Sequence, residues 1–458
     1  MQHDAAGHPI SLEDPRAATL WNQTVTAFLA HSAATPLRLG ETLALAPGFA
    51  LGHAAQGLFL SLLGRRELDP AIDAALAAAR AAADQGGADA REREYVAALA
   101  EHRAGRAFAA SDRLERIVSR HPGDSLAAKL AQAIRFMLGD AAGMRAAADR
   151  MVQPHAGFGR DHPHLGYMLG QRAFALEETG DYALAEADGR AGLELAPDDV
   201  WGLHAVAHVM DMTGRADAGV RWLAGKSRHW AHCNNFGCHV WWHLALFHLD
   251  RGNLGAALAL YDRKVRPEPT DDYRDIANAA SLLLRLELEG TDVGGRWEEL
   301  GALCAARTED GCVVFADLHY LMALNRTGRE PEAAALTARI ARDAQGLDHD
   351  QHEVCAVAGL PAARGLNAFR AGRWAEAHRA LALALPQLHR VGGSHAQRDL
   401  FERMTIDAAL RAGDVRAAEA SLAARCARRG AEDGYAARRR AAIAERAGAL
   451  RAAALAAE

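Results

Sequence analysis

Ten glycines recur along this chain at intervals of 34 to 44 residues, and each separates two Ala- and Leu-rich stretches of helical periodicity. This period suits two helices of three to four turns joined by short loops. Glycine ends the first helix well because it adopts a positive φ without the steric cost of a Cβ atom. The sequence therefore predicts an all-α, right-handed α-solenoid of about ten helix pairs. The junction glycines are Gly64, Gly105, Gly139, Gly180, Gly214, Gly252, Gly290, Gly328, Gly372 and Gly413.

Residues near these glycines support the same division into helices. Asp140 and Asp414 each follow a junction glycine, where a short carboxylate caps the next helix. Pro122 and Pro197 each lie 17 residues beyond a junction glycine, where the second helix should end.

The unit resembles the tetratricopeptide repeat, most clearly over residues 173–197. Gly189 and Gly192 depart from that motif, which usually has a large and a small residue there. Over nearly its full length the chain also resembles the tetratricopeptide repeat protein 38 family. That family has no settled biochemical activity, so the resemblance implies a helical-repeat fold and leaves the function open. The stretches that carry it are residues 203–210, 239–248, 280–290 and 392–399.

The repeats predict one continuous core without a true domain boundary. We expect a helical lead-in over residues 1–40, the tetratricopeptide-like solenoid over 41–425 and C-terminal capping helices over 426–458. The periodicity is least regular over residues 330–394, so a division of the chain is expected there if one exists.

The charge composition argues against a nucleic acid partner, because the net charge is −6 and the pI about 6.4. Nearly all positive charge is arginine, which indicates codon bias in a GC-rich bacterial genome; the three lysines are Lys129, Lys226 and Lys264. The Arg-rich residues 425–440 are interrupted by acids and alanines, and we expect them to form a solvated helix face.

Six cysteines are too few for a disulfide framework in a chain of 458 residues, which fits a reducing compartment. The first residues have neither a basic nor an apolar segment of a signal peptide, and no apolar run is long enough to span a membrane. We therefore expect a cytoplasmic protein that does not bind membranes.

Histidines share one side of several first helices. Counted from their junction glycines, His204, His208, His239, His243 and His319 fall within roughly a 100° arc of the helix, apart from the apolar positions. On a solenoid this histidine side should face the concave groove.

Two of these pairs have metal-ligand spacing. His204 with His208, and His239 with His243, lie four residues apart and so on one side of a helix. The two pairs could converge and bind a divalent transition metal such as Zn, Fe, Ni or Cu, or supply a general base and an electrophile. Asp211 could orient such a ligand, and His319 would contribute from further away. Two alternatives stay open: a polar ligand-binding wall without metal, and packing against nearby tryptophans.

Four further segments contain polar residues that could have either a structural or a functional role. Residues 232–239 hold two Cys and two His with unusual zinc spacing, and we favour a loop that starts the next helix. Ser394 and Gln397 form a capping box that leaves His395, Arg398 and Asp399 in the first helical turn, where an anion could bind. Residues 161–164 form a loop from which His164 could reach the groove, and residues 348–353 form a solvated cap.

Two functions follow as hypotheses. The first is a scaffold that binds a peptide, a protein partner or a small molecule in its groove. The second is an enzyme, a metal-dependent hydrolase or oxygenase, that uses the histidines; no phosphate-binding loop, nucleophile elbow or Rossmann fingerprint is present. The oligomeric state is not predicted. The candidate catalytic residues are His204, His208, His243 and His395. The candidate ligand-binding residues are His204, His208, Asp211, His239, His243, His319 and Arg398.

Overall fold

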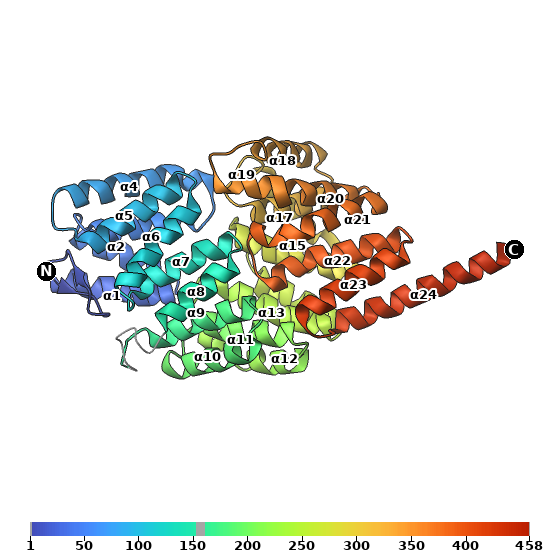
Figure 1. The fold of residues 1–458 in the computed structure, drawn as a ribbon, viewed down its shortest axis with the longest axis horizontal. Coiled ribbons are helices and arrows are strands. Elements are labelled where there is room, and N and C mark those ends of the chain that lie inside the picture. Colours follow the sequence, from blue (N-terminus) through green and yellow to red (C-terminus); the bar gives the residue numbers. More distant parts are fainter. Residues whose placement is uncertain (1, 153–160, 458) are drawn as a thin grey trace. The chain divides into compact units, whose positions relative to one another are not determined.

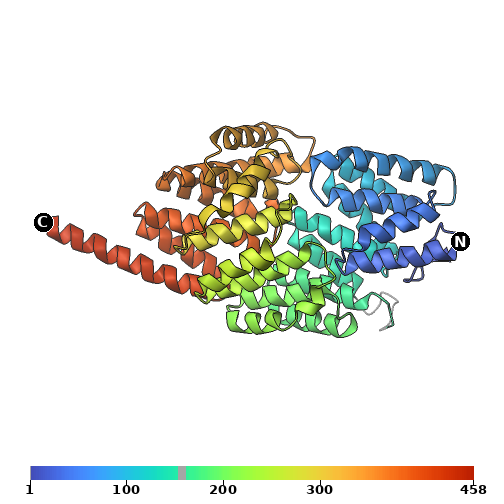
Figure 2. The same ribbon diagram turned by 180° about the vertical axis from the view of Figure 1, so that it is seen from behind.

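The computed structural model describes residues 2–152 and 161–457, and these residues form an all-α structure apart from one two-stranded hairpin (Figures 1 and 2). The chain divides into two compact units. Unit 1 comprises Met1–Val209, Lys226–Gly237 and Leu347–Asp350, and unit 2 comprises Met210–Gly225, Cys238–Gly346 and Gln351–Glu458.

This division replaces the single continuous core that the repeats predict. A chain of this length exceeds the size at which one hydrophobic core keeps growing, which favours a division into compact units. Two of the divisions, at residues 346/347 and 350/351, fall within the predicted region 330–394. The other three fall inside α11, between α12 and η2, and inside α13.

Unit 1 starts with the hairpin, which the sequence does not predict, and continues with successive antiparallel helices. Its elements are β1 (Gln2–His3), β2 (Pro9–Ile10), α1 (Pro15–Leu29), α2 (Thr35–Leu45), α3 (Ala50–Ser61), η1 (Arg66–Leu68), α4 (Asp69–Asp84), α5 (Ala90–Arg103), α6 (Ala107–Arg120), α7 (Ser125–Met137), α8 (Ala141–Met151), α9 (Leu165–Glu178), α10 (Tyr182–Leu195), most of α11 (Val200–Met212) and η2 (Ser227–Trp230).

Unit 2 is helical throughout its described residues, and its last helix, α24, extends beyond the others as a single helix (Figure 1). Its elements are α12 (Ala216–Ala224), α13 (Phe236–Asp250), α14 (Leu254–Leu260), η3 (Tyr261–Val265), α15 (Tyr273–Leu288), η4 (Gly294–Arg296), α16 (Trp297–Ala305), α17 (Val314–Arg326), α18 (Glu330–Asp343), α19 (Asp350–Val354), η5 (Cys355–Gly359), α20 (Leu360–Arg370), α21 (Trp374–Ala384), η6 (Leu385–Val391), α22 (His395–Arg411), α23 (Val415–Arg429) and α24 (Gly434–Ala457).

The predicted helix pairs are confirmed. All ten junction glycines have a positive φ, between 58° and 86°, and each lies between the two helices of a pair. The carboxylate of Asp140 accepts a hydrogen bond from the amide of Gly143, and that of Asp414 from the amide of Ala417, as caps do. α6 ends before Pro122 and α10 before Pro197. Each unit is therefore a stack of tetratricopeptide-like helix pairs.

Two first helices, α15 and α17, are buried on nearly every side. In α17, every residue from Val314 to Leu324 is buried, including the charged Asp317, which pairs with Arg339. Among the described residues, no helix combines the length and apolarity needed to cross a membrane. The six cysteines are all free, in agreement with the absence of a disulfide framework.

The Arg-rich segment near the C-terminus is not the solvated face that its composition indicates. Arg425 is completely buried and pairs with Asp399 at 2.5 Å and Asp433 at 2.6 Å. Arg429 is buried and pairs with Asp211 at 3.2 Å. Asp399 and Asp211 lie 26 and 218 residues from their arginines, so local composition does not reveal most of the network.

Candidate functional site

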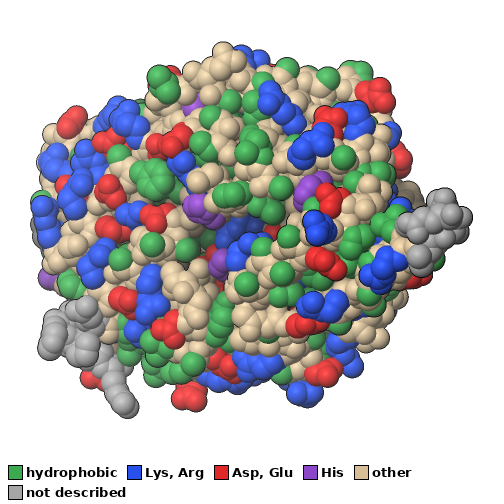
Figure 3. Space-filling view, turned by 45° about the vertical axis from the view of Figure 1, so that its right-hand side comes forward, with side chains coloured by type: hydrophobic (Ala, Val, Ile, Leu, Met, Phe, Trp, Pro, Cys, Tyr) green, Lys and Arg blue, Asp and Glu red, His purple; other side chains and the backbone are tan. Residues whose placement is uncertain are grey.

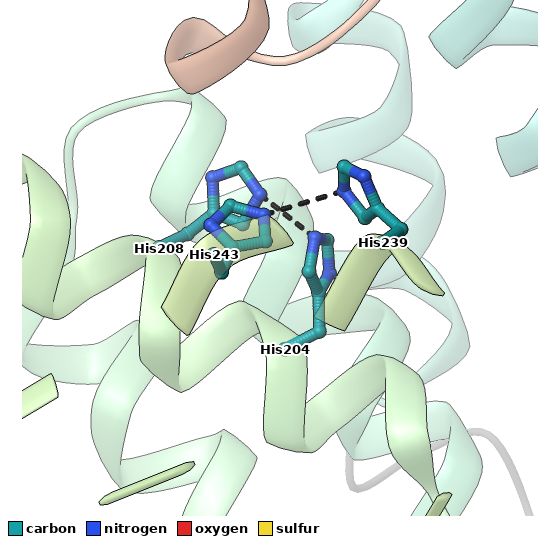
Figure 4. Close-up of side chains that lie close together, drawn as sticks. All are labelled: His204, His208, His239 and His243. Carbon is teal, nitrogen blue, oxygen red and sulfur yellow. Dashed lines mark hydrogen bonds between the residues drawn. The ribbon is translucent and has the colours of Figure 1, made fainter. Parts of the chain in front are cut away.

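The first histidine pair lies on α11 in unit 1. His204 and His208 are 2 % and 0 % exposed, and their Nε2 atoms lie 2.9 Å apart (Figure 4). The ring of Phe174 stacks on His204 and meets His208 edge-on. The helical spacing places both imidazoles on one side of α11, and the aromatic neighbours keep water away from them.

Two acidic residues at the end of α9 complete this group, and the sequence analysis missed them. Oε2 of Glu177 lies 3.6 Å from Nδ1 of His208, and both side chains are completely buried. Glu177, Glu178 and His208 each offer one ligand atom, and these three atoms lie within 4.8 Å of one another. Acids in the last turn of a helix oppose its dipole, so their position before Gly180 was a usable signal.

The second pair lies on α13 in unit 2. Nε2 of His243 is 3.3 Å from Nε2 of His239, and Nδ1 of His239 is 2.9 Å from Oδ1 of Asn278. Since Asn Oδ1 only accepts, Nδ1 of His239 carries the hydrogen and Nε2 keeps its lone pair. Burial lowers the pKa of His239 to about 4, against a smaller opposing effect of the Asn278 hydrogen bond.

The nitrogen separations inside each pair suit two ligands on one ion. With metal–nitrogen bonds of about 2.0–2.1 Å, two nitrogens lie about 2.9 Å apart at a right angle and about 3.4 Å apart at the tetrahedral angle. The observed separations are 2.9 Å on α11 and 3.3 Å on α13, and Figure 4 shows the imidazoles of each pair turned toward one another. An N–H···N hydrogen bond in the metal-free protein has the same length, so either pair can hold a proton or a metal.

The helical arc predicts that the histidines line the wall of an open groove, but in the structure four of them are buried. His204, His208, His243 and His319 are all at most 2 % exposed. Their helices are covered on nearly every side, so a polar face that looks open on a helical wheel lies inside the protein.

Two further candidates have structural partners of their own. Nδ1 of His319 lies 2.7 Å from the backbone oxygen of Phe315, so it donates there, and burial lowers the pKa of His319 to about 4. Asp211 accepts hydrogen bonds from Arg429 through its carboxylate and its backbone oxygen, at 3.2 and 2.6 Å. Asp211 therefore forms an ion pair with Arg429, and its ligand-orienting role stays a prediction.

The start of α22 has the predicted capping box. Ser394 accepts from the Gln397 amide, and Gln397 accepts from the Ser394 amide. Arg398 donates to the backbone oxygen of Gly393 and lies 3.4 Å from Nδ1 of His395. Asp399 does not face solvent; it pairs with Arg403 at 2.6 Å and also with Arg425, and these charges hold the pKa of its carboxyl well below the usual range despite burial.

The weaker segments have mainly structural roles. Asn234 accepts from the amide of Phe236 and so starts α13, as the loop interpretation predicts. His164 is buried between Ser125 and Thr26, and the carboxylate of Asp350 accepts from the amide of Phe108. Asp350 thus caps α6, a different helix from its own, where the sequence indicates a solvated cap.

Basic and acidic side chains alternate over the molecular face in Figure 3. No extended patch of one sign is present on that face, in keeping with the modest net charge.

Comparisons with known proteins add little to what the fold and the histidine pairs show. No family model matches the chain. A solved structure described as the structure of Naa15/Naa10 bound to HypK-THB is similar over 90 % of this chain, with 11 % sequence identity and a TM-score of 0.25. The matched part covers 63 % of that chain, less than two thirds of its length. A likeness this distant carries no argument about function, and the helical-repeat fold is established by the helix pairs themselves.

Proposed function

We propose that this protein is a metal-dependent enzyme built on tetratricopeptide-like repeats, with a buried centre at His204 and His208. The observation that carries the proposal is the burial of two imidazoles, 2.9 Å apart at Nε2, beside the Glu177 carboxylate. An extended peptide site needs an open groove, whereas these side chains suit a small ligand enclosed by protein.

The proposed ligand set joins nitrogen and oxygen donors. Glu177 and Glu178 supply carboxylate oxygens beside His208. His239 and His243 form a separate nitrogen pair in unit 2 that could bind an ion of its own. Imidazole and carboxylate together suit Zn, Fe, Ni or Cu more than Mg or Ca. Such an ion supplies Lewis-acid activation of a carbonyl or of bound water. The reaction class that follows is hydrolysis for Zn or Ni and oxygenation for Fe or Cu.

The neighbouring groups prepare the donors for an ion. Asn278 holds the hydrogen of His239 on Nδ1, which leaves Nε2 free of hydrogen on the side of His243. Burial keeps that imidazole neutral at physiological pH, as metal binding requires.

A second proposal is binding of a peptide, a protein or a small molecule on the repeat surface of a cytoplasmic scaffold. Its support is the stack of helix pairs, an architecture that presents extended surfaces. A function cannot be assigned from this fold alone, so the buried histidines favour the enzyme.

We also propose membership of the tetratricopeptide repeat protein 38 family. The resembling stretches 203–210 and 239–248 contain both histidine pairs, and 392–399 contains His395 and Arg398. If the proposal holds, members of that family keep the four histidines more strictly than the exposed residues of the same helices.

Elemental analysis of the untagged protein tests the metal proposal. We expect near-stoichiometric Zn, Fe, Ni or Cu, as purified or after reconstitution, and its loss in a His204→Ala/His243→Ala double variant. Absence of all four metals from the folded wild-type protein after reconstitution would overturn the proposal. The exposed His3→Ala is the matched control, and it should keep the full metal content.

Two paired variants test each histidine pair by itself. His204→Ala/His208→Ala should remove the ion held in unit 1, and His239→Ala/His243→Ala should remove any ion held in unit 2. Retention of all the metal in His204→Ala/His208→Ala would contradict a centre at that pair. Circular dichroism and thermal melting show whether the variants remain folded.

A further inference from the structure

We propose that Lys129 in unit 1 forms an imine with a small polar aldehyde or ketone, in a buried site shared with Asp199, Trp201, Gln132 and Gln171. This proposal does not depend on the metal centre, because it uses none of the proposed ligands.

Lys129 stands out in an arginine-rich chain. Only three of the 52 basic residues are lysines; Lys226 is half-buried and Lys264 exposed, whereas Lys129 is 4 % exposed. Its Nζ lies 4.0 Å above the ring of Trp201. A guanidinium would stack on that indole at least as well, but only an amine loses its proton readily and then acts as a nucleophile.

The amine lacks the partners that usually stabilise a buried ammonium. Among the described residues it forms no hydrogen bond and no ion pair, and the indole is its one cation–π contact. Burial lowers the pKa of Lys129 to about 7 and raises the pKa of Asp199 to about 7, while the attraction between the two groups opposes both shifts. A neutral amine beside a protonated carboxyl is the pair that imine formation requires.

Four more polar atoms in the same part of unit 1 make no hydrogen bond with the described residues. Gln132 lies one turn after Lys129 on α7, and its Nε2 donates to the backbone oxygen of Gln171 at 2.7 Å. Gln171 follows Gly170, where an added Cβ would meet the carboxylate of Asp199. The four atoms are Oε1 of Gln132, Nε2 of Gln171, Oδ1 of Asp199 and Nε1 of Trp201, from side chains at most 8 % exposed.

These atoms define the class of ligand. Gln171 and Trp201 offer donors, Gln132 offers an acceptor, and the Asp199 carboxyl donates when it is protonated and accepts when it is not. A ligand with several hydroxyl, carbonyl or carboxylate oxygens would satisfy them. Leaving that many buried polar atoms without partners costs about 1–3 kcal/mol each, and a bound polar ligand removes the cost.

The reaction balances with the groups present. The lone pair of neutral Nζ attacks the carbonyl carbon, and the C=O π electrons move to oxygen. A proton passes from nitrogen to that oxygen to give a carbinolamine. Asp199 then protonates the hydroxyl, which leaves as water while the nitrogen lone pair forms the C=N bond. The ligand carbon is thereby an electrophilic imine, and no external oxidant or reductant is needed.

Borohydride trapping tests the proposal with two probes, glyceraldehyde and pyruvate. Each is incubated with the folded full-length protein at neutral pH, reduced with sodium borohydride, digested and analysed by mass spectrometry. We expect modification of Lys129 at least tenfold above Lys226 and Lys264, which serve as internal controls. Equal modification of all three lysines, or modification that spares Lys129, overturns the proposal.

Two variants sharpen the test. Lys129→Arg retains a basic side chain that can stack on the indole but cannot form an imine, so it should abolish trapping with metal content unchanged. Asp199→Asn keeps the side-chain cap on the Gly202 amide and should slow trapping at least tenfold. If wild-type protein binds no metal but Lys129 is still trapped, the metal centre is contradicted and the imine site is supported. The failure of one proposal can therefore be distinguished from the failure of the other.

Discussion

Nδ1 of His208 lies 3.6 Å from Oε2 of Glu177, and neither side chain is exposed to solvent. The pair brings together α11 and the last turn of α9 within unit 1. A buried carboxylate and imidazole at this separation share either a proton or a cation, because isolated burial of a carboxylate charge is costly. Several consequences of this and other buried groups can be measured.

Glu177→Gln should weaken metal binding by about 10- to 100-fold, because it keeps the side-chain volume but removes the charge beside His208. Competition with a chelator of known affinity measures the change. Glu194→Gln alters an exposed acid on α10 and should leave the affinity unchanged. Equal affinities of Glu177→Gln and wild type would remove Glu177 from the centre.

Gly166→Ala should destabilise unit 1 by about 1–3 kcal/mol. A Cβ at this position would lie 2.6 Å from Cβ of Ala196 and 2.8 Å from the backbone oxygen of Gly192, so α9 and α10 would have to separate. Gly255→Ala is the matched control, because its Cβ would meet open space inside a helix and should be neutral or stabilising by up to about 1 kcal/mol. Urea unfolding measures both; similar stabilities would show that α9 and α10 adjust freely.

Arg425→Met should cost about 3–5 kcal/mol of unfolding free energy, since it leaves Asp399 and Asp433 buried without their main partner. Arg428→Met, three residues later on α23, removes a half-exposed pair with Glu402 and should cost less than about 1 kcal/mol. The arginine charges hold the pKa values of both aspartates below their unfolded values. Their stabilisation is therefore present above about pH 4 and is lost as the pH falls further, more strongly in wild type than in Arg425→Met.

His164→Gln should reduce the loss of stability between pH 7 and pH 5 by about 2 kcal/mol. Burial lowers the pKa of His164 to about 4 in the folded state, whereas an unfolded histidine titrates near 6.5. Between about pH 6.5 and pH 4 the unfolded chain therefore binds one proton more than the folded protein at this residue. The contribution of His164 to stability is fully present above about pH 6.5 and is lost as the pH falls toward 4. Glutamine can keep the hydrogen bonds to Ser125 and Thr26 without titrating. Denaturant titrations at both pH values, with His3→Gln as an exposed control, should show the difference; identical pH dependence in His164→Gln and wild type would contradict it.

Much of the fold follows from the local sequence. The junction glycines, the caps at Asp140 and Asp414 and the capping box of Ser394 depend on residues within one or two turns, and all have the predicted geometry. The spacing of His204 with His208 and of His239 with His243 also fixes the approach of the two rings within each pair. Interactions over such short sequence separations are determined by helix geometry alone.

The remaining features depend on which helices become neighbours. Gly189 and Gly192 look like defects in the repeat motif, but a Cβ at Gly192 would lie 2.7 Å from the backbone oxygen of Gly166. Glu177 beside His208, Lys129 over Trp201 and Arg425 between two aspartates join residues 8 to 72 positions apart. The sequence by itself determined where helices begin and end and which side chains share a helix face. Only the tertiary structure decided which faces were covered, because burial and charge pairing depend on the packing of whole helices.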